Sequence, residues 1–262
     1  TLEFNYDTLV KRFQELAFLN KGITISFSAY SVDSETQEPI FRKEVYHHTG
    51  GLLDFVNYLN EGKDTLYQNS IYIQGVKENV VVEIAIQHTT AYSETLLSFA
   101  NNINTISGGT HVTGFRSVMT RLINDYARKV NLLKESEDNL TGEDVREGLT
   151  VIISVKVTEP QFEGQTKAKL GNTEVRSIVE QIMAEEMGHF FQSNPLIAKA
   201  IVTKAIEACR ARQAARKARD LVRRKSVLET TTLPGKLADC SEQNPEKTEL
   251  FLVEGESAGG CF

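Results

Sequence analysis

The chain has 262 residues, of which 40% are hydrophobic and 24% charged, with a net charge of -6, a composition typical of a soluble globular protein. No run of 18 apolar residues occurs, which excludes a membrane-spanning helix, and the N-terminus lacks the basic start and apolar stretch of a signal peptide. Cys209, Cys240 and Cys261 are too far apart for a metal motif or a disulfide framework, which favours a cytoplasmic location.

The first part of the chain predicts a helix followed by a hairpin. Helical spacing of apolar residues runs over 7–22, where Asp7 can cap the start and Gly22 can end the helix. Apolar and polar residues alternate over 22–30, as in a half-buried strand, and 39–48 is its expected hairpin partner.

The middle of the chain mixes helices and strands. We expect helices at 51–62 and 111–130 and strands at 70–75, 79–89, 93–103 and 149–157, the last a buried β-branched run. Thr141 and Asp144 have capping-box-like spacing for a short helix. Residues 161–171 are predicted to form a polar loop.

The last part is predicted to contain two long helices, a linker and one strand. Helical patterning extends from Thr173 to Lys225 and is interrupted at Pro195, which disfavours helical structure in the preceding residue. Pro234, Gly235 and Pro245 indicate a linker, and residues 249–253 are predicted to form a short buried strand.

The second long helix is strongly basic. Between Arg210 and Lys225 there are eight Lys or Arg residues and one acid, although the whole chain has more acidic than basic residues. At about 100° per residue, one stripe contains Arg212, Arg216, Arg219 and Arg223, and a second contains Arg210, Lys217 and Arg224. Like charges four residues apart cost stability unless an anion neutralises them, which favours contact with nucleic-acid phosphates over a merely solvated surface helix.

A second candidate site is the loop around Gln165 and Lys167. A lysine on such a loop is most often simply solvated. The functional alternative is a donor pair that reaches a phosphate, with Lys as a charge and Gln as a neutral donor. The sequence contains neither GxxxxGK[ST] nor GxGxxG, so a nucleotide would have to be held mainly by another domain.

Glu254 follows the last strand segment and precedes a glycine-containing turn. If the segment is a parallel strand, Glu254 lies at its carboxyl end, and ligands of open α/β sheets bind at that edge. Mg²⁺ prefers carboxylate oxygens as ligands. A single glutamate is weak evidence, because the aspartates that precede it form no cluster in the sequence.

Several of these segments together resemble the B subunit of bacterial DNA gyrase, a type IIA topoisomerase. The similarity covers essentially the whole chain and is carried, in family order, by FLNKGITI, GGLLDFVNYLN, NNINTISGGTHVTGFRSVMTR, DVREGLTVIISVKVTEPQFEGQTKAKLGNTEVR, ARQAARKARDLVRRKS, LPGKLADC and LVEGESAGG. Glu256 departs from the Asp or Asn usual in the family, and the ending GGCF departs from the usual continuation.

The resemblance implies a fold and a domain plan. The expected class is α+β: a mixed-sheet transducer domain with a ribosomal-protein-like βαβ unit, then long helices and the first strand of a truncated α/β Toprim domain. The transducer would span 1–225 with the basic helix at its end, the linker 226–247 and the Toprim segment 248–262. The chain would then be a piece of a longer protein that also has an ATPase domain.

The resemblance also implies roles. Gln165 and Lys167 would contact the terminal phosphate of ATP, and Glu254 would be catalytic and hold Mg²⁺ beside the scissile phosphate. ATP and Mg²⁺ are cofactors of the complete enzyme, and neither is expected to bind this chain tightly. The chain alone is expected neither to hydrolyse ATP nor to cleave DNA. Expected partners are double-stranded DNA, the A subunit of gyrase, and a second copy of the B subunit. The alternatives are the B subunit of topoisomerase IV and a non-catalytic DNA-binding scaffold.

Overall fold

The computed structural model describes residues 4–32, 39–230 and 244–248, with only the backbone described at 31–32, 39–40, 223–230 and 245. Two compact units divide the chain, Thr1–Cys209 and Arg210–Phe262. The first unit contains a central sheet, and the described part of the second is the end of a helix and a short 3-10 turn, η1 (Pro245–Lys247).

The central sheet has five strands in the order β3-β4-β7-β5-β6. β3 (Ile71–Lys77), β4 (Val80–His88) and β7 (Leu149–Lys156) are antiparallel neighbours, whereas β5 (Thr95–Ala100) pairs in parallel with β7 and antiparallel with β6 (Ile103–Asn104). The parallel pair is connected through α3 (Thr110–Lys129) and α4 (Gly142–Arg146), which confirms the predicted mixed sheet with a βαβ unit.

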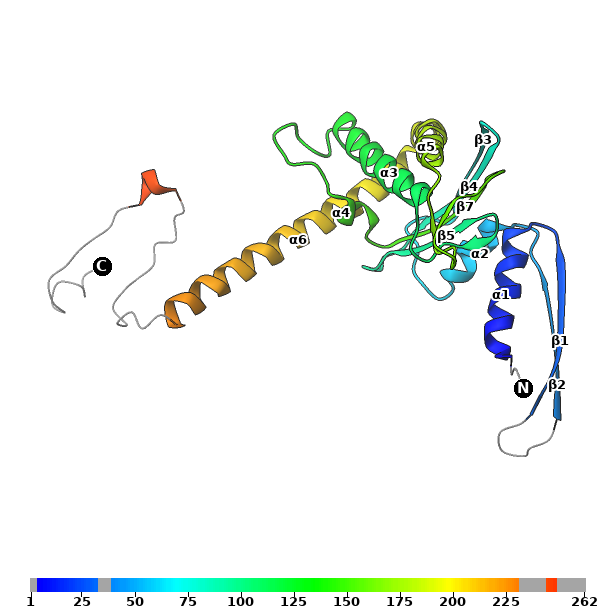
Figure 1. Cartoon of the computed structure of the whole chain (residues 1–262). Helices are drawn as coiled ribbons and strands as arrows, with labels where there is room; N and C mark the ends of the chain where they lie inside the picture. Colours follow the sequence, from blue (N-terminus) through cyan, green and yellow to red (C-terminus); the bar gives the residue numbers. More distant parts are fainter. Residues whose placement is uncertain (1–3, 33–38, 231–243, 249–262) are drawn as a thin grey trace. The chain divides into compact units, whose positions relative to one another are not determined.

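Helices cover both faces of this sheet (Figure 1). On one face α3, α5 (Thr173–Ser193) and the first part of α6 (Pro195–Thr230) bury a large apolar core against alternate residues such as Ile84 and Ile153. On the other face α2 (Leu52–Leu59) and the end of α1 (Tyr6–Leu19) pack against Ala85, Phe99 and Ile152. Because β7 is buried on both faces, its sequence is a mostly apolar, β-branched run without the alternation of a half-buried strand, and the two buried polar residues within it, Thr150 and Ser154, are small.

The N-terminal hairpin forms a separate two-stranded sheet. β1 (Thr24–Val32) pairs antiparallel with β2 (Pro39–His47), as the sequence predicts, and α1 lies along it. The cap prediction for α1 is wrong: the Asn5 side chain accepts a hydrogen bond from the Thr8 N–H at 2.9 Å, and Asp7 lies in the first turn. The helix ends at Leu19, before Gly22.

The strand predicted over 93–103 is a hairpin. Asn101 and Asn102 both have positive φ, 48° and 64°, and they connect β5 to β6 in a two-residue turn. Both residues of a type I′ turn require positive φ, which asparagine tolerates better than most residues. The asparagine pair was therefore the signal for a turn that hydrophobic alternation alone did not reveal.

Other predictions in this part are confirmed. Thr141 and Asp144 form a reciprocal capping box at the start of α4. The two long helices are separated at Asn194, and Pro195 is the first residue of α6, where its missing N–H costs no hydrogen bond. α6 continues to Thr230, beyond the predicted end of helical patterning at Lys225.

A glycine allows α3 and α5 to approach closely. A Cβ atom at Gly114 of α3 would lie 2.6 Å from the backbone oxygen of Arg176 in α5. Gly188 of α5, in contrast, has nothing within 4 Å of the position a Cβ would take.

We therefore expect Gly114→Ala to lower the free energy of unfolding by about 1–3 kcal/mol, because overpacking against backbone outweighs the gain in helix propensity. The matched change Gly188→Ala should raise it by up to about 1 kcal/mol. Urea unfolding of both variants measures this, and equal stabilisation by both changes would show that the α3–α5 contact is not close.

Two histidines are buried in the core. His88 Nδ1 lies 2.8 Å from the Tyr67 hydroxyl, and His111 Nε2 lies 3.1 Å from Thr105 Oγ1. Burial, helped by the nearby charge of Lys204, lowers the pKa of His88 to about 3, and burial lowers the pKa of His111 to about 4.

Acidification from pH 6 to pH 4 should therefore destabilise the fold. The unfolded chain takes up protons near the ordinary histidine pKa of about 6.5, whereas the folded state keeps both rings neutral, so stability is lost as pH falls below that value. Each histidine contributes a slope of at most about 1.4 kcal/mol per pH unit. Urea unfolding across this range should show a shallower slope for His88→Gln than for the unsubstituted chain; identical slopes would argue against a neutral buried His88.

Candidate functional site

Gln165 and Lys167 lie at the tip of a small hairpin. The predicted polar loop contains two short antiparallel strands, β8 (Phe162–Glu163) and β9 (Lys169–Leu170), which sequence reasoning missed. The tip is a turn in which the Lys167 N–H donates to the Gly164 oxygen at 3.3 Å, and φ is positive at both residues, 75° at Gly164 and 55° at Lys167. The side chains of Gln165 and Lys167 are exposed, and Lys167 Nζ lies 5.9 Å from the centre of the Phe162 ring.

The base of this lysine hairpin, residues 161–171, is attached to the start of α3. The Ser107 N–H donates to the Ala168 oxygen at 2.9 Å, and the Leu170 N–H donates to the Gly108 oxygen at 3.1 Å. On the other side, buried Asn172 accepts from the Gln161 N–H at 2.7 Å. Its side-chain amide also donates to Glu174 at 2.7 Å and lowers the pKa of that carboxyl. A fixed base with an exposed tip suits a hairpin that presents its lysine to something outside this chain.

A polar cavity of about 510 Å³ lies beside the hairpin base. It is bordered by the start of α3, by β5 and by Lys169 of β9, which is paired with Glu163 at 3.1 Å. Glu94 and Arg116 also line this cavity.

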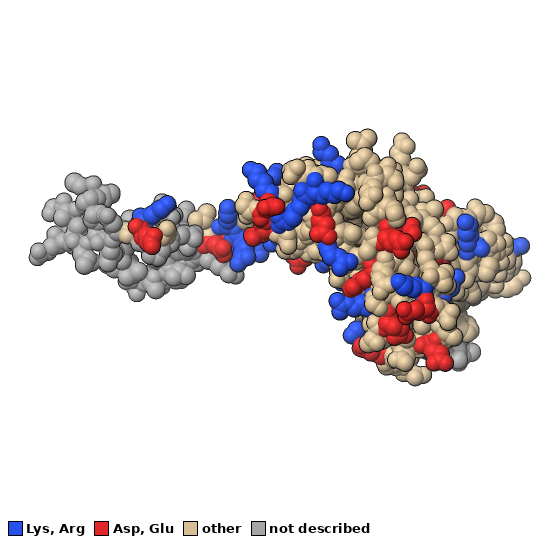
Figure 2. Space-filling view, turned by 90° about the horizontal axis from the view of Figure 1, so that it is seen from above, with Lys and Arg blue, Asp and Glu red and all other residues tan. Residues whose placement is uncertain are grey.

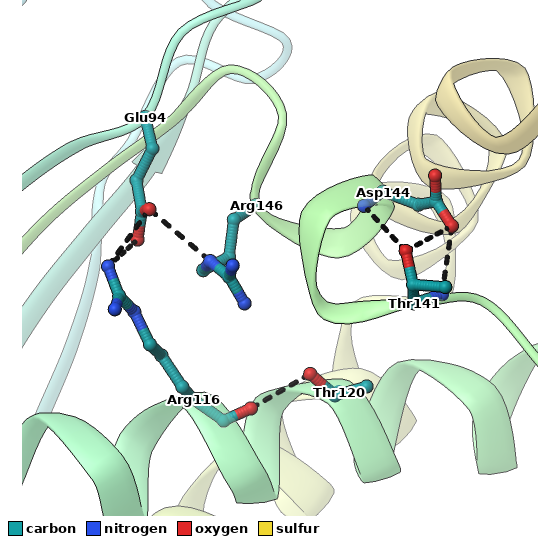
Figure 3. Close-up of polar contacts among 6 residues, drawn as sticks. All are labelled: Glu94, Arg116, Thr120, Thr141, Asp144 and Arg146. Atoms are coloured by element: carbon teal, nitrogen blue, oxygen red, sulfur yellow. Dashed lines mark hydrogen bonds and ion pairs between the residues drawn. The ribbon is translucent and has the colours of Figure 1, made fainter. Parts of the chain in front are cut away.

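Glu94 connects two helices at this point. Its carboxylate accepts from Arg116 Nη2 of α3 at 3.1 and 3.2 Å and from Arg146 Nε of α4 at 3.3 Å (Figure 3). Figure 3 also shows the capping box of Thr141 and Asp144 that starts α4 and so places Arg146. Sequence reasoning missed this cluster, because Arg116 and Arg146 lie 22 and 52 residues from Glu94 and no local pattern marks the three residues.

The basic part of α6 is helical, as predicted. Of its candidate DNA contacts, Arg210, Arg216, Lys217 and Arg219 are exposed, and Arg212 is half-buried. Figure 2 shows basic side chains gathered along this helix. The small apolar side chains between the basic stripes, such as Ala215 and Ala218, are also exposed.

The other candidate residues lie outside what the structure describes. Arg223 and Arg224 are in α6, but their side chains are not described, and Glu254 lies beyond the described ranges. Within the described ranges no group of three His, Cys, Asp or Glu residues could hold a metal ion. In the same part of the chain no helix is long and apolar enough to cross a membrane.

Residues 51–221 match the family model described as DNA gyrase B. The chain belongs to the DNA gyrase B family. It is 54% identical over 259 residues to the B subunit of DNA gyrase from Clostridium acetobutylicum, a match that covers 98% of this chain and 39% of that protein. The corresponding protein of Synechocystis is 53% identical over the whole chain, which covers 24% of that relative. The chain thus spans well under half the length of these curated relatives.

Solved structures of gyrase B and of topoisomerase IV are similar to this chain in fold. The 43K ATPase domain of Thermus thermophilus gyrase B, solved with an aminocoumarin, aligns with a TM-score of 0.71 and 39% identity, over 84% of this chain and 57% of that one. The topoisomerase IV ATP-binding domain of Francisella tularensis aligns with a TM-score of 0.63 and 26% identity, over 81% of this chain and 55% of that one. Most of the region expected to be a transducer therefore aligns with a structure described as an ATPase domain.

Proposed function

We propose that this chain is the part of a DNA gyrase B protein that couples ATP binding and hydrolysis to passage of one DNA duplex through another. The complete enzyme would be an ATP-hydrolysing type IIA topoisomerase that introduces negative supercoils. The B protein would assemble with the A subunit of gyrase and with a second copy of itself. The observation that carries the proposal is the lysine hairpin, whose base is hydrogen-bonded to the start of α3 while Lys167 is exposed at its tip.

The hairpin fits a phosphate. The Lys167 ammonium and the Gln165 amide are both donors on one exposed turn, and their side chains can reach an anion held by a neighbouring domain. ATP would supply the terminal phosphate and the free energy of its hydrolysis. Lys167 would stabilise negative charge on that phosphate, and Gln165 would orient it. A non-catalytic scaffold has no need for such a donor pair.

The basic part of α6 would contact the phosphates of double-stranded DNA. Its exposed cations outnumber its single acid, Asp220, and arginine provides fork-like donors for phosphate oxygens. No aromatic side chains lie among them, so we expect binding to the backbone without sequence preference.

Glu254 would be the catalytic carboxylate that holds Mg²⁺ in the Toprim part of the complete enzyme. A carboxylate is the ligand type that Mg²⁺ prefers, and the remaining ligands would come from outside this chain. The enzyme would act in the cytoplasm, and this chain alone would neither bind ATP or Mg²⁺ tightly nor hydrolyse ATP.

Lys167→Ala in the complete B protein should lower the rate of ATP hydrolysis by about 10²–10³-fold, because one charge-assisted contact to the developing charge is lost, worth roughly 3–4 kcal/mol. Nucleotide binding should be reduced much less, since base and ribose are held elsewhere. Steady-state ATPase assays and nucleotide titrations measure the two effects.

Lys169→Ala is the matched control on the same hairpin. Lys169 is already paired with Glu163, and this exposed pair contributes little, so ATP hydrolysis should stay within about two-fold of normal. Normal turnover in Lys167→Ala would remove Lys167 from the nucleotide site and with it the main support for the proposal.

The stripe of Arg212, Arg216, Arg219 and Arg223 should act as a group on DNA. Replacing all four with Gln keeps helix propensity but removes four charges. Affinity for duplex DNA should fall, and the slope of log affinity against log salt should flatten by up to about 0.9 for each lost phosphate contact.

A matched control replaces four scattered, exposed lysines of the first unit with Gln: Lys11, Lys43, Lys63 and Lys129. This variant has the same net charge as the stripe variant, so its salt slope separates local contact from overall charge. If both variants flatten the slope equally, the stripe is not a DNA-contact surface.

A further inference from the structure

The connection between β4 and β5, residues 89–94, receives polar contacts from several elements. Its first residue is fixed to the start of β7, because the Thr89 N–H and hydroxyl both donate to the Gly148 oxygen, at 2.8 and 3.1 Å. Its last residue, Glu94, accepts from Arg116 of α3 and Arg146 of α4. Three elements thus meet at one short segment.

A fourth contact comes from α6 through Lys204. Its Nζ donates to the Thr90 oxygen at 3.1 Å, lies 3.3 Å from Glu147 Oε1 and is 5.1 Å from the centre of the Tyr92 ring. Only 13% of the Lys204 side chain is exposed, much less than in an ordinary surface ion pair. A cation with so little access to water depends on its protein partners, and their loss is costly.

This polar contact is directional, whereas the rest of the α6 docking is not. The neighbouring residues Ile201, Val202, Ala205 and Ile206 are buried in the main core. Apolar burial depends mainly on buried area, so it specifies the rotation and slide of a helix less sharply than a hydrogen-bonded charge does. The ammonium, held between a carbonyl and a carboxylate, fixes the register of α6 against the 89–94 segment.

The same segment leads back to the lysine hairpin. The hairpin base is hydrogen-bonded to Ser107 and Gly108, which lie just before α3. α3 bears Arg116, and Arg116 donates to Glu94. A continuous series of contacts therefore extends from the hairpin, through α3 and residues 89–94, to Lys204 of α6.

We propose that Lys204 is a positioning residue that couples the state of the lysine hairpin to helix α6. This inference rests on the proposed function. When the hairpin shifts with the terminal phosphate, α3 and Glu94 carry the shift to residues 89–94, and Lys204 passes it to the helix that continues into the basic segment. Lys204 itself touches neither nucleotide nor DNA, since its side chain is nearly buried.

The test uses Lys204→Met in the complete B protein, reconstituted with the A protein into the whole enzyme. Methionine keeps the apolar stem but removes the ammonium. We expect basal ATP hydrolysis to stay within two-fold, and DNA stimulation of that hydrolysis to fall at least five-fold, with supercoiling reduced in parallel. The salt dependence of DNA binding should not change, which separates positioning from direct phosphate contact.

Lys199→Met is the matched control, because Lys199 is exposed on the same helix, and it should leave stimulation unchanged. Lys204→Arg should keep most of the stimulation that Lys204→Met loses, since a guanidinium can donate to both the Thr90 carbonyl and the Glu147 carboxylate. Glu147→Gln, which keeps the side-chain shape, should reduce stimulation in the same direction and act non-additively with Lys204→Met. This variant also tests the proposal if Lys204→Met does not fold.

Two outcomes would overturn the inference. One is unchanged DNA stimulation in both Lys204→Met and Glu147→Gln with folded protein; the other is an equal loss of basal and stimulated rates that tracks a lower melting temperature. Lys167→Ala is assayed in parallel. If Lys167→Ala retains normal hydrolysis, the proposed function fails. If Lys167→Ala loses hydrolysis while Lys204→Met and Glu147→Gln both keep normal stimulation, only the coupling role is overturned.

Discussion

Strand β7 is buried on both faces, and the positions of the other elements depend on it. Every residue from Leu149 to Val155 is buried. Ile153 and its alternate neighbours face the core under α3 and α5, while Ile152 faces the core under α2. Because β7 pairs with β4 on one edge and β5 on the other, one register joins both cores. A slip of one position in β7 would therefore disturb both layers at once.

The candidate functional residues and the contact of Lys204 lie near the two ends of this strand. At its start, Gly148 accepts from Thr89, and Glu147 pairs with Lys204, so α6 and the 89–94 segment are held where β7 begins. Beyond its end, the chain passes into the lysine hairpin, whose base returns to the start of α3. A rigid central strand with contact points at both ends is suited to transmit a displacement, because a packed core does not absorb small shifts. Coupling energy between these contacts is measured by double substitution, because proximity alone does not demonstrate it.

Local sequence signals predicted the elements well, and long-range contacts were not predictable from them. Helical periodicity predicted α3, a β-branched run predicted β7, and proline chemistry predicted the break at Pro195, because each signal depends on neighbouring residues only. The Asn101–Asn102 turn was missed because an apolar run on both sides looked like one strand. β8 and β9 were missed because strands of two residues are too short for a period. Glu94, Arg146 and Lys204 are brought together by the tertiary fold, and charged residues at isolated positions have no pattern that distinguishes them from solvated ones.

Helix α6 joins two parts whose stability has different physical sources. Up to Cys209 its inner side chains are buried in the core, and Lys204 adds a directional contact. From Arg210 on, nearly all described side chains are exposed, so burial contributes little. There the alanines supply the helix propensity, while like charges at i and i+4 oppose it by about 0.2–0.5 kcal/mol per pair. A bound polyanion would remove this repulsion and stabilise the helix in proportion to the phosphates contacted. The basic part is thus the part of α6 whose stability should respond most to a bound polyanion.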